Sequence, residues 1–165
     1  MEIVYIETSV ISHAAAWPST NAAVFVLQQQ AREWWARERS KYSLVTSQLV
    51  LDEASLGDPI AAAERLELLA DIPLIPTDRR VETVANELVA RSLIPAKARL
   101  DALHVAFAAV GAAQFLLTQN CRHIANAHTL RRVYRALEEL GYPGLLIYTP
   151  AEFLGGIDDE SESYP

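Results

Sequence analysis

Apolar runs and amphipathic stretches alternate along this chain, as they do where strands and helices follow one another. The longer stretches repeat apolar residues at helical spacing and predict helices between the strands. Strands that alternate with helices favour a parallel sheet covered on both faces, so we expect an α/β fold, a three-layer α/β/α domain with a mostly parallel central sheet. The short apolar runs predict strands at residues 3–6, 42–46, 74–76, 114–118 and 145–148.

Capping residues and helix breakers position the predicted helices. Ser47 can cap a helix that Gly57 ends, and Asp58 followed by Pro59 marks the start of another helix. In the helix expected at residues 21–39, the pair Trp34-Trp35 is expected to pack in the core or in a dimer contact. Further helices are expected from Thr8 to the break at Trp17-Pro18, from Thr77 to Ser92, from Pro95 to Gly111 and at residues 127–140.

The length of the chain is typical of a domain with a single hydrophobic core. Its 165 residues, 51% of them hydrophobic, predict a single domain over residues 1–156, followed by an acidic, disordered tail at residues 157–165. No signal peptide is apparent, and no apolar stretch is long enough to cross a membrane. The single cysteine, Cys121, offers no disulfide framework, which favours a reducing cytoplasm as the location.

The net charge of −7 argues against a broad electrostatic grip on nucleic acid. Four of the acids lie in the terminal tail, however, and the remainder of the chain carries about −3. The charge balance therefore leaves a nucleic-acid substrate open, provided that local basic groups or a bound metal ion hold it.

Three acids stand where strands or helices begin or end. Glu7 follows the first strand, so it either binds a cation or stabilises the positive end of the next helix. Glu53 lies on the apolar side of its helix, where a carboxylate is costly unless it is paired or bound to a metal. Asp101 opens a nearly all-apolar helix and is either a cap or a ligand. Carboxylates at the carboxyl edge of a parallel sheet are typical of a metal site.

Several neutral or basic residues accompany these acids, and each has two interpretations. Ser9 either orients a ligand or belongs to the first turn of a helix. Asn120, just past the strand that ends near Thr118, either completes a metal shell or forms a turn. His104 shares a face with Asp101 and is interpreted as a satisfied core histidine outside the metal shell. Arg122 either contacts a phosphate at the mouth of the crevice or lies in a solvated loop.

These patterns, in this order, resemble the PIN-domain ribonucleases, and among them the VapC-like toxins of type II toxin–antitoxin pairs. The resemblance extends from Ile3 to about Leu154. It rests on Glu7-Thr8-Ser9 after the first strand, Glu53 on a helix after the second strand, Asp101-Ala102-Leu103-His104, and Leu116-Leu117-Thr118 followed by Asn120. Glu7 and Asn120 depart from the pattern, because the family usually has aspartate at both positions.

The resemblance implies hydrolysis of RNA phosphodiester bonds assisted by Mg²⁺ or Mn²⁺. Glu7 and Asp101 would bind the main ion, Glu53 would share it or hold a second ion, and Asn120 would position a metal-bound water, with Ser9 and Thr118 in support. Because Asn120 removes one negative charge, we expect a single ion and reduced or metal-selective activity. The resemblance also implies an RNA substrate, a cognate antitoxin and a homodimer, for which the helix at residues 21–39 is the candidate contact.

Two other function classes remain. The first is a PIN-like binding or regulatory module that has lost catalysis, for which Asn120 is the main argument. The second is a phosphotransfer or receiver-like domain, which needs a lysine at a strand end; Lys41 and Lys97 are not so placed. A dinucleotide-binding enzyme is the least favoured, since no Gly-rich phosphate loop follows a strand.

Overall fold

The computed structural model describes residues 1–154, which fold around a sheet of four parallel strands. This confirms the expected α/β class and the mostly parallel sheet. The tail expected at residues 157–165 lies outside the described residues. The strands are β1 (Ile3–Ile6), β2 (Ser43–Val45), β3 (Phe115–Leu117) and β4 (Leu146–Tyr148), in the spatial order β2-β1-β3-β4.

The strand order fixes where a ligand site can form. The chain passes from β1 to β2 on one side and later places β3 on the other side of β1, where Tyr5 pairs with Leu116. The direction of winding therefore reverses between β1 and β3. In open α/β sheets the crevice beyond the carboxyl ends of two such strands is the usual ligand site. Glu7 directly follows β1, and Thr118 directly follows β3, so both lie at this reversal.

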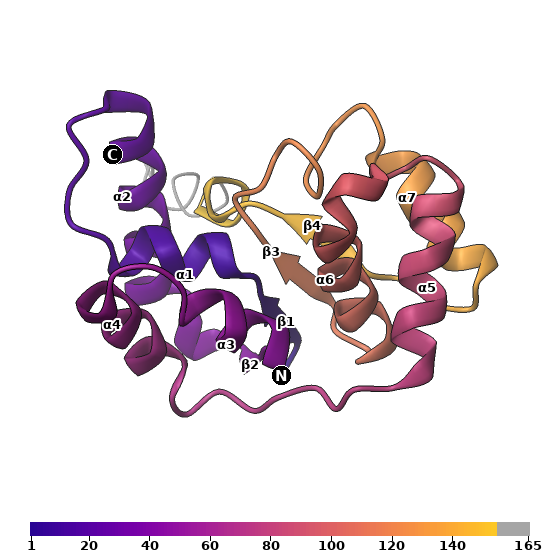
Figure 1. Cartoon of the computed structure of the whole chain (residues 1–165), viewed down its shortest axis with the longest axis horizontal. Coiled ribbons are helices and arrows are strands. Elements are labelled where there is room, and N and C mark those ends of the chain that lie inside the picture. The colour runs from indigo at the N-terminus through magenta and orange to yellow at the C-terminus, as the bar shows by residue number, and fades with distance from the viewer. Residues whose placement is uncertain (155–165) are drawn as a thin grey trace, which may run out of the picture.

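Helices cover the sheet on both sides, which agrees with a three-layer arrangement. Figure 1 shows α1 to α4 gathered on one side of the strands and α5 to α7 on the other. The helices α5 and α6 pack closely against each other, and α1 packs against α2, α3 and α4. Their bounds are α1 (Thr8–Ala15), α2 (Ala22–Arg37), α3 (Gln48–Ala54), α4 (Pro59–Leu69), α5 (Arg79–Ala90), α6 (Arg99–Val110) and α7 (Leu130–Glu139), with short 3₁₀ turns η1 (Arg39–Lys41) and η2 (Ala96–Ala98).

One hydrophobic core joins the two sides of the sheet. It includes Ile6 of β1, Trp34 of α2, Leu88 of α5 and Leu137 of α7, all at most 1% exposed. Trp34 is fully buried in the single chain, so it belongs to the core and is not available as a dimer contact. Burial of this apolar surface is the main force that holds the layers together.

Several expected boundaries differ from the structure. The strand expected at residues 74–76 is reduced to one bridge, between Leu74 and Thr46. Helix α5 is capped by Asp78, whose carboxylate accepts from the Arg80 backbone NH, and not by Thr77. The carboxylate is the stronger acceptor, which explains the one-residue shift.

The helices α6 and α7 also start later than expected. Pro95 leads only into the 3₁₀ turn η2, and α6 begins at Arg99. Asp101 is therefore in the first turn of α6, where the helix dipole favours a carboxylate, and not about two turns after a helix start at Pro95. Turns occupy the chain before Leu130, because Asn126 bonds to neighbouring backbone groups.

Within residues 1–154, no helix is both long enough and apolar enough to cross a membrane.

Candidate active site

Glu7 is a buried carboxylate with one engaged oxygen and one open oxygen. It is 4% exposed and caps α1. Its Oε2 accepts hydrogen bonds from the Ser9 backbone NH at 3.0 Å, from the Thr118 hydroxyl at 2.8 Å and from the Ser9 hydroxyl. No described residue bonds to Oε1. Three donors hold the carboxylate in one orientation and leave Oε1 available to a ligand, so the capping role and the ligand role are compatible.

Glu53 is held by two side chains from other elements. Its Oε1 accepts from the Thr8 hydroxyl at 2.7 Å and lies 2.6 Å from Nε2 of His104. Partial burial by itself would raise the pKa of Glu53, but the hydrogen bonds from His104 and Thr8 contribute to lowering the pKa overall. Glu53 therefore stays ionised, and its Oε2 has no partner among the described residues.

Asp101 pairs with a histidine that the sequence assigned no role in the site. Its Oδ2 lies 2.9 Å from Nδ1 of His123, and the two side chains are 20% and 19% exposed. His123 comes from the loop after β3, and its backbone NH bonds to the Asn120 side-chain oxygen at 3.0 Å. Asp101 thus also keeps one oxygen, Oδ1, without a partner in the described part of the chain.

Asn120 forms the turn that brings His123 to Asp101. Its own backbone NH donates to the Thr118 hydroxyl at 3.0 Å, and its backbone oxygen accepts from Ile124 and Ala125. Because Oδ1 is occupied by His123, the amide nitrogen Nδ2 is the free polar group of this side chain within residues 1–154. The turn interpretation of Asn120 is confirmed, and Nδ2 remains available as a donor to a ligand.

Two paths of hydrogen bonds include the four candidate residues around the carboxyl edge of the sheet. One path runs from Glu7 through Thr118 and Asn120 to His123 and Asp101. A second path starts at Thr8, next to Glu7, and passes through Glu53 to His104, which lies one turn after Asp101 on α6. The structure therefore brings together residues that are more than 110 positions apart in the chain.

The donor set fits a hard divalent cation in its chemistry. Glu7, Glu53 and Asp101 each leave one carboxylate oxygen unbonded, and carboxylate oxygens are the ligands that Mg²⁺ and Mn²⁺ prefer. In residues 1–154, however, no three His, Cys, Asp or Glu side chains already stand in a metal-binding arrangement. The geometry thus supplies the ligand atoms but not a closed coordination shell.

Basic residues gather on the side of the molecule that contributes Asp101. The segment 79–135 carries nine of the 14 lysine and arginine residues and only three acids. Arg122, Arg131 and Arg132 are exposed, and within the described residues they form no ion pair. Free arginines beside an acidic site are suited to bind the phosphates of a nucleic acid.

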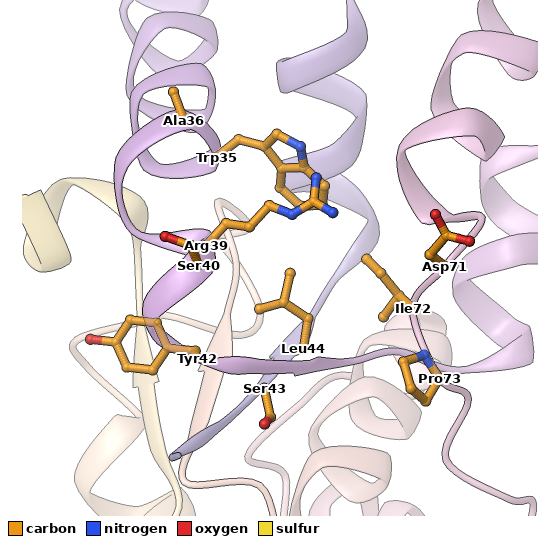
Figure 2. A pocket seen from close by; sticks show the side chains of 10 residues that line it. All are labelled: Trp35, Ala36, Arg39, Ser40, Tyr42, Ser43, Leu44, Asp71, Ile72 and Pro73. Carbon is orange, nitrogen blue, oxygen red and sulfur yellow. The ribbon is translucent and has the colours of Figure 1, made fainter.

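A separate pocket of about 480 Å³ lies along the edge strand β2 and contains none of the candidate residues. Figure 2 shows the Arg39 guanidinium over the Trp35 ring, with Asp71 on the far side of the hollow. The guanidinium carbon is 4.7 Å from the ring centre, a cation–π contact. Size alone would favour this pocket as the site, but the acids and their partners favour the carboxyl edge of the sheet.

Three side chains near the site, those of Tyr5, His104 and His123, were not assigned to it from the sequence. His104 bonds to Glu53, His123 bonds to Asp101, and the Tyr5 hydroxyl lies 2.9 Å from Nδ1 of His104. Tyr5 lies in an apolar strand, His104 in an apolar helix and His123 in a polar loop, so composition gave each of them an ordinary structural interpretation. The available signal was spacing: Tyr5 and Glu7 are two apart on a strand, and Asp101 and His104 are three apart on a helix.

Comparisons with protein-family models, with curated proteins and with solved structures find no match for this chain. The functional conclusion therefore rests on the residues of the site.

Proposed function

We propose that this chain is a metal-dependent ribonuclease that hydrolyses internal phosphodiester bonds of RNA. The observation that carries the proposal is the set of three carboxylates, Glu7, Glu53 and Asp101, each with one oxygen fixed by protein donors and one oxygen open. They lie around the winding reversal between β1 and β3, and a basic segment flanks them.

The role that we propose for each residue follows from the side-chain atoms that the protein leaves unbonded. Glu7 and Asp101 would hold the main cation, and Glu53 would share it through Oε2. When bound, Mg²⁺ or Mn²⁺ supplies polarisation of the scissile phosphate and a lowered pKa of the attacking water. Asn120 Nδ2 can donate a hydrogen bond to that water or to the phosphate, and Arg122 can contact a neighbouring phosphate. Ser9 and Thr118 keep Glu7 in place.

Three acids favour one bound ion, since Asn120 adds no charge at the fourth position. Without a cation the three carboxylates repel one another, and binding of the ion offsets that repulsion. We therefore propose single-ion occupancy at this site.

The biological setting that we propose is the toxin of a toxin–antitoxin pair in the cytoplasm, inhibited by its cognate antitoxin and assembled as a homodimer. The support is the resemblance in the order and context of Glu7, Glu53, Asp101 and Asn120. On α2, the candidate dimer contact, the large exposed apolar side chains are Phe25 and Val26 at the amino-terminal end, whereas Trp34 is buried.

The test compares RNA cleavage by the wild-type chain and by Asp101→Asn, with Mg²⁺ or Mn²⁺ and a pool of structured RNAs. We expect metal-dependent cleavage by the wild type and at least a 100-fold loss in the variant, on the order of one lost metal ligand. Asp52→Asn is the matched control, because Asp52 is an exposed acid beside Glu53 that should not affect the rate. Absence of cleavage by folded, antitoxin-free wild type with either ion would contradict the proposal.

One observation favours a second candidate, a non-catalytic RNA-binding module. The Asn120 side-chain oxygen and one Asp101 oxygen are already occupied by His123. RNA binding that persists without any divalent ion, together with no cleavage, would select this candidate.

A further inference from the structure

One buried histidine connects the three elements that carry the acids. Glu7 follows β1, Glu53 lies on α3 and Asp101 lies on α6. His104, one turn after Asp101, is 0% exposed, with Nε2 at 2.6 Å from Glu53 Oε1 and Nδ1 at 2.9 Å from the Tyr5 hydroxyl. Through its two ring nitrogens, α6 is therefore joined to both α3 and β1.

The chain of hydrogen bonds continues past Tyr5 to the start of α3. The Tyr5 hydroxyl lies 2.7 Å from the Ser47 hydroxyl, and both residues are fully buried. Ser47 caps α3, and its hydroxyl oxygen accepts from the Val50 backbone NH at 3.4 Å. The chain of hydrogen bonds therefore contacts α3 at two points, at Glu53 and at the capping residue Ser47.

The bonding partners assign the hydrogen positions along this path. The Glu53 carboxylate can only accept, so the proton on His104 is at Nε2. Nδ1 then accepts from the Tyr5 hydroxyl, which in turn accepts from Ser47, whose oxygen accepts from Val50. This order gives every buried group a partner; the reverse order would leave the Ser47 proton without an acceptor among the described residues.

We propose that His104 is a positioning residue of the metal site, which fixes Glu53 so that Oε2 is presented to the cation. This inference rests on the proposed function, because it assigns a role toward the same ion. The second donor to Oε1 is Thr8, the residue next to Glu7, so the bonds that orient Glu53 also fix its place relative to Glu7.

A role in core packing alone would not require these contacts. A histidine inside an apolar helix must bond through both nitrogens to offset its burial, and an aliphatic residue of similar size would avoid that requirement. Partners that orient metal ligands commonly change metal affinity by about 10- to 100-fold when they are removed. His104 stands in that relation to Glu53.

The test measures Mn²⁺ affinity by calorimetry at one pH near neutrality in the full chain. His104→Leu removes both hydrogen bonds, and we expect Mn²⁺ affinity to fall by about 10-fold or more. His104→Gln keeps an NH donor near Glu53 and should stay within about threefold of the wild type. Tyr5→Phe removes the bonds of the Tyr5 hydroxyl to His104 Nδ1 and to Ser47 but leaves His104 Nε2 beside Glu53, and it provides a second variant if His104→Leu does not fold.

Gln28→Leu is the matched control for lost buried hydrogen bonds. Gln28 is 4% exposed and bonds to the backbone of Ser19 and Trp17, and it makes no hydrogen bond to any of the three acids. It should lower stability without changing Mn²⁺ affinity. The inference is overturned if His104→Leu binds Mn²⁺ like the wild type, or if Gln28→Leu weakens binding equally.

A metal-free measurement tests the geometry independently. Nitrogen-15 spectra of the histidine rings should show His104 with its proton on Nε2, and Glu53→Gln should shift that signal. A proton on Nδ1 alone would overturn the assignment. Wild type that neither binds Mn²⁺ nor cleaves RNA would remove the proposed function, whereas metal binding that is indifferent to His104 would remove only this inference.

Discussion

At the scale of single residues, the site is a set of carboxylates whose charge is met by specific donors. Burial of an isolated carboxylate is unfavourable by several kcal/mol, on the order expected for an unpaired ion. Glu7 offsets this with three hydrogen bonds to one oxygen, and Glu53 with two. These hydrogen bonds replace part of the hydration that the two carboxylates lose on burial.

The pKa of Glu53 predicts how stability depends on pH. Because folding lowers this pKa below its ordinary value of 4.5, the unfolded chain binds more protons near that pH. The contribution of Glu53 is therefore present above about pH 4.5 and is lost as the pH falls through the folded-state pKa. We expect Glu53→Gln to lower the free energy of unfolding by about 1–2 kcal/mol at pH 7, and by progressively less toward pH 3.

Urea unfolding of both proteins between pH 7 and pH 3 measures this difference. Glu67→Gln is the control, since Glu67 is exposed and its side chain has no partner among the described residues. A difference between wild type and Glu53→Gln that stays constant with pH would show that Glu53 does not titrate as described.

At the scale of elements, caps decide where helices begin, and they bring the site residues to the helix starts. Glu7, Ser47 and Asp58 each accept a hydrogen bond from a backbone NH in the first turn of α1, α3 and α4. In α1 and α3 the caps also belong to the polar network of the site. In α4 the cap is exposed and separate from the site, so it isolates the structural effect.

Asp58→Ala should destabilise the protein by about 1 kcal/mol, the usual effect of a lost N-cap. The reason is that Asp58 Oδ2 accepts from the Ala61 backbone NH at 2.9 Å. In a protein of this size the change corresponds to a fall in Tm of about 2–4 °C, measurable by circular dichroism. Asp58→Asn retains the acceptor and should have a small effect; an equal loss in both variants would assign the effect to charge.

At the scale of the whole molecule, the sheet order and the shared core make the two sides interdependent. The acids come from both sides of the strands, Glu7 and Glu53 with α1 and α3, and Asp101 with α6 (Figure 1). A site built across the sheet needs both sides to fold together. The hydrophobic core that joins Trp34 to Leu88 and Leu137 gives a physical reason for such coupling.

Unfolding by urea should therefore be a single transition for the whole chain. The three tryptophans, Trp17, Trp34 and Trp35, lie in α2 or between α1 and α2, so tryptophan fluorescence reports the side of α1 to α4, whereas circular dichroism also reports α5, α6 and α7. We expect the two signals to give the same midpoint. A second transition seen only by circular dichroism would show that the chain unfolds in two parts and that the single-domain interpretation is wrong.

Local sequence patterns were sufficient to predict the fold class, the four paired strands and the approximate course of the helices. These follow from local causes: apolar periodicity, caps such as Asp58-Pro59, and breakers such as Gly57. The sequence also singled out Glu7, Glu53, Asp101 and Asn120, because an acid or amide at the end of an apolar run is locally unusual. The start of α6 and the cap of α5 were predicted wrongly: a 3₁₀ turn stands between Pro95 and α6, and Asp78 caps α5 in place of its neighbour Thr77.

The partners of those residues, in contrast, depend on the folded arrangement of the chain. Thr118 bonds to Glu7 across 111 positions of the chain, His104 to Tyr5 across 99, and His123 to Asp101 across 22. No local pattern specifies such pairs, because they depend on which strands lie side by side and on how α6 is rotated above them. The identity of the acids is therefore a property of the sequence, whereas the orientation of their open oxygens is a property of the folded sheet.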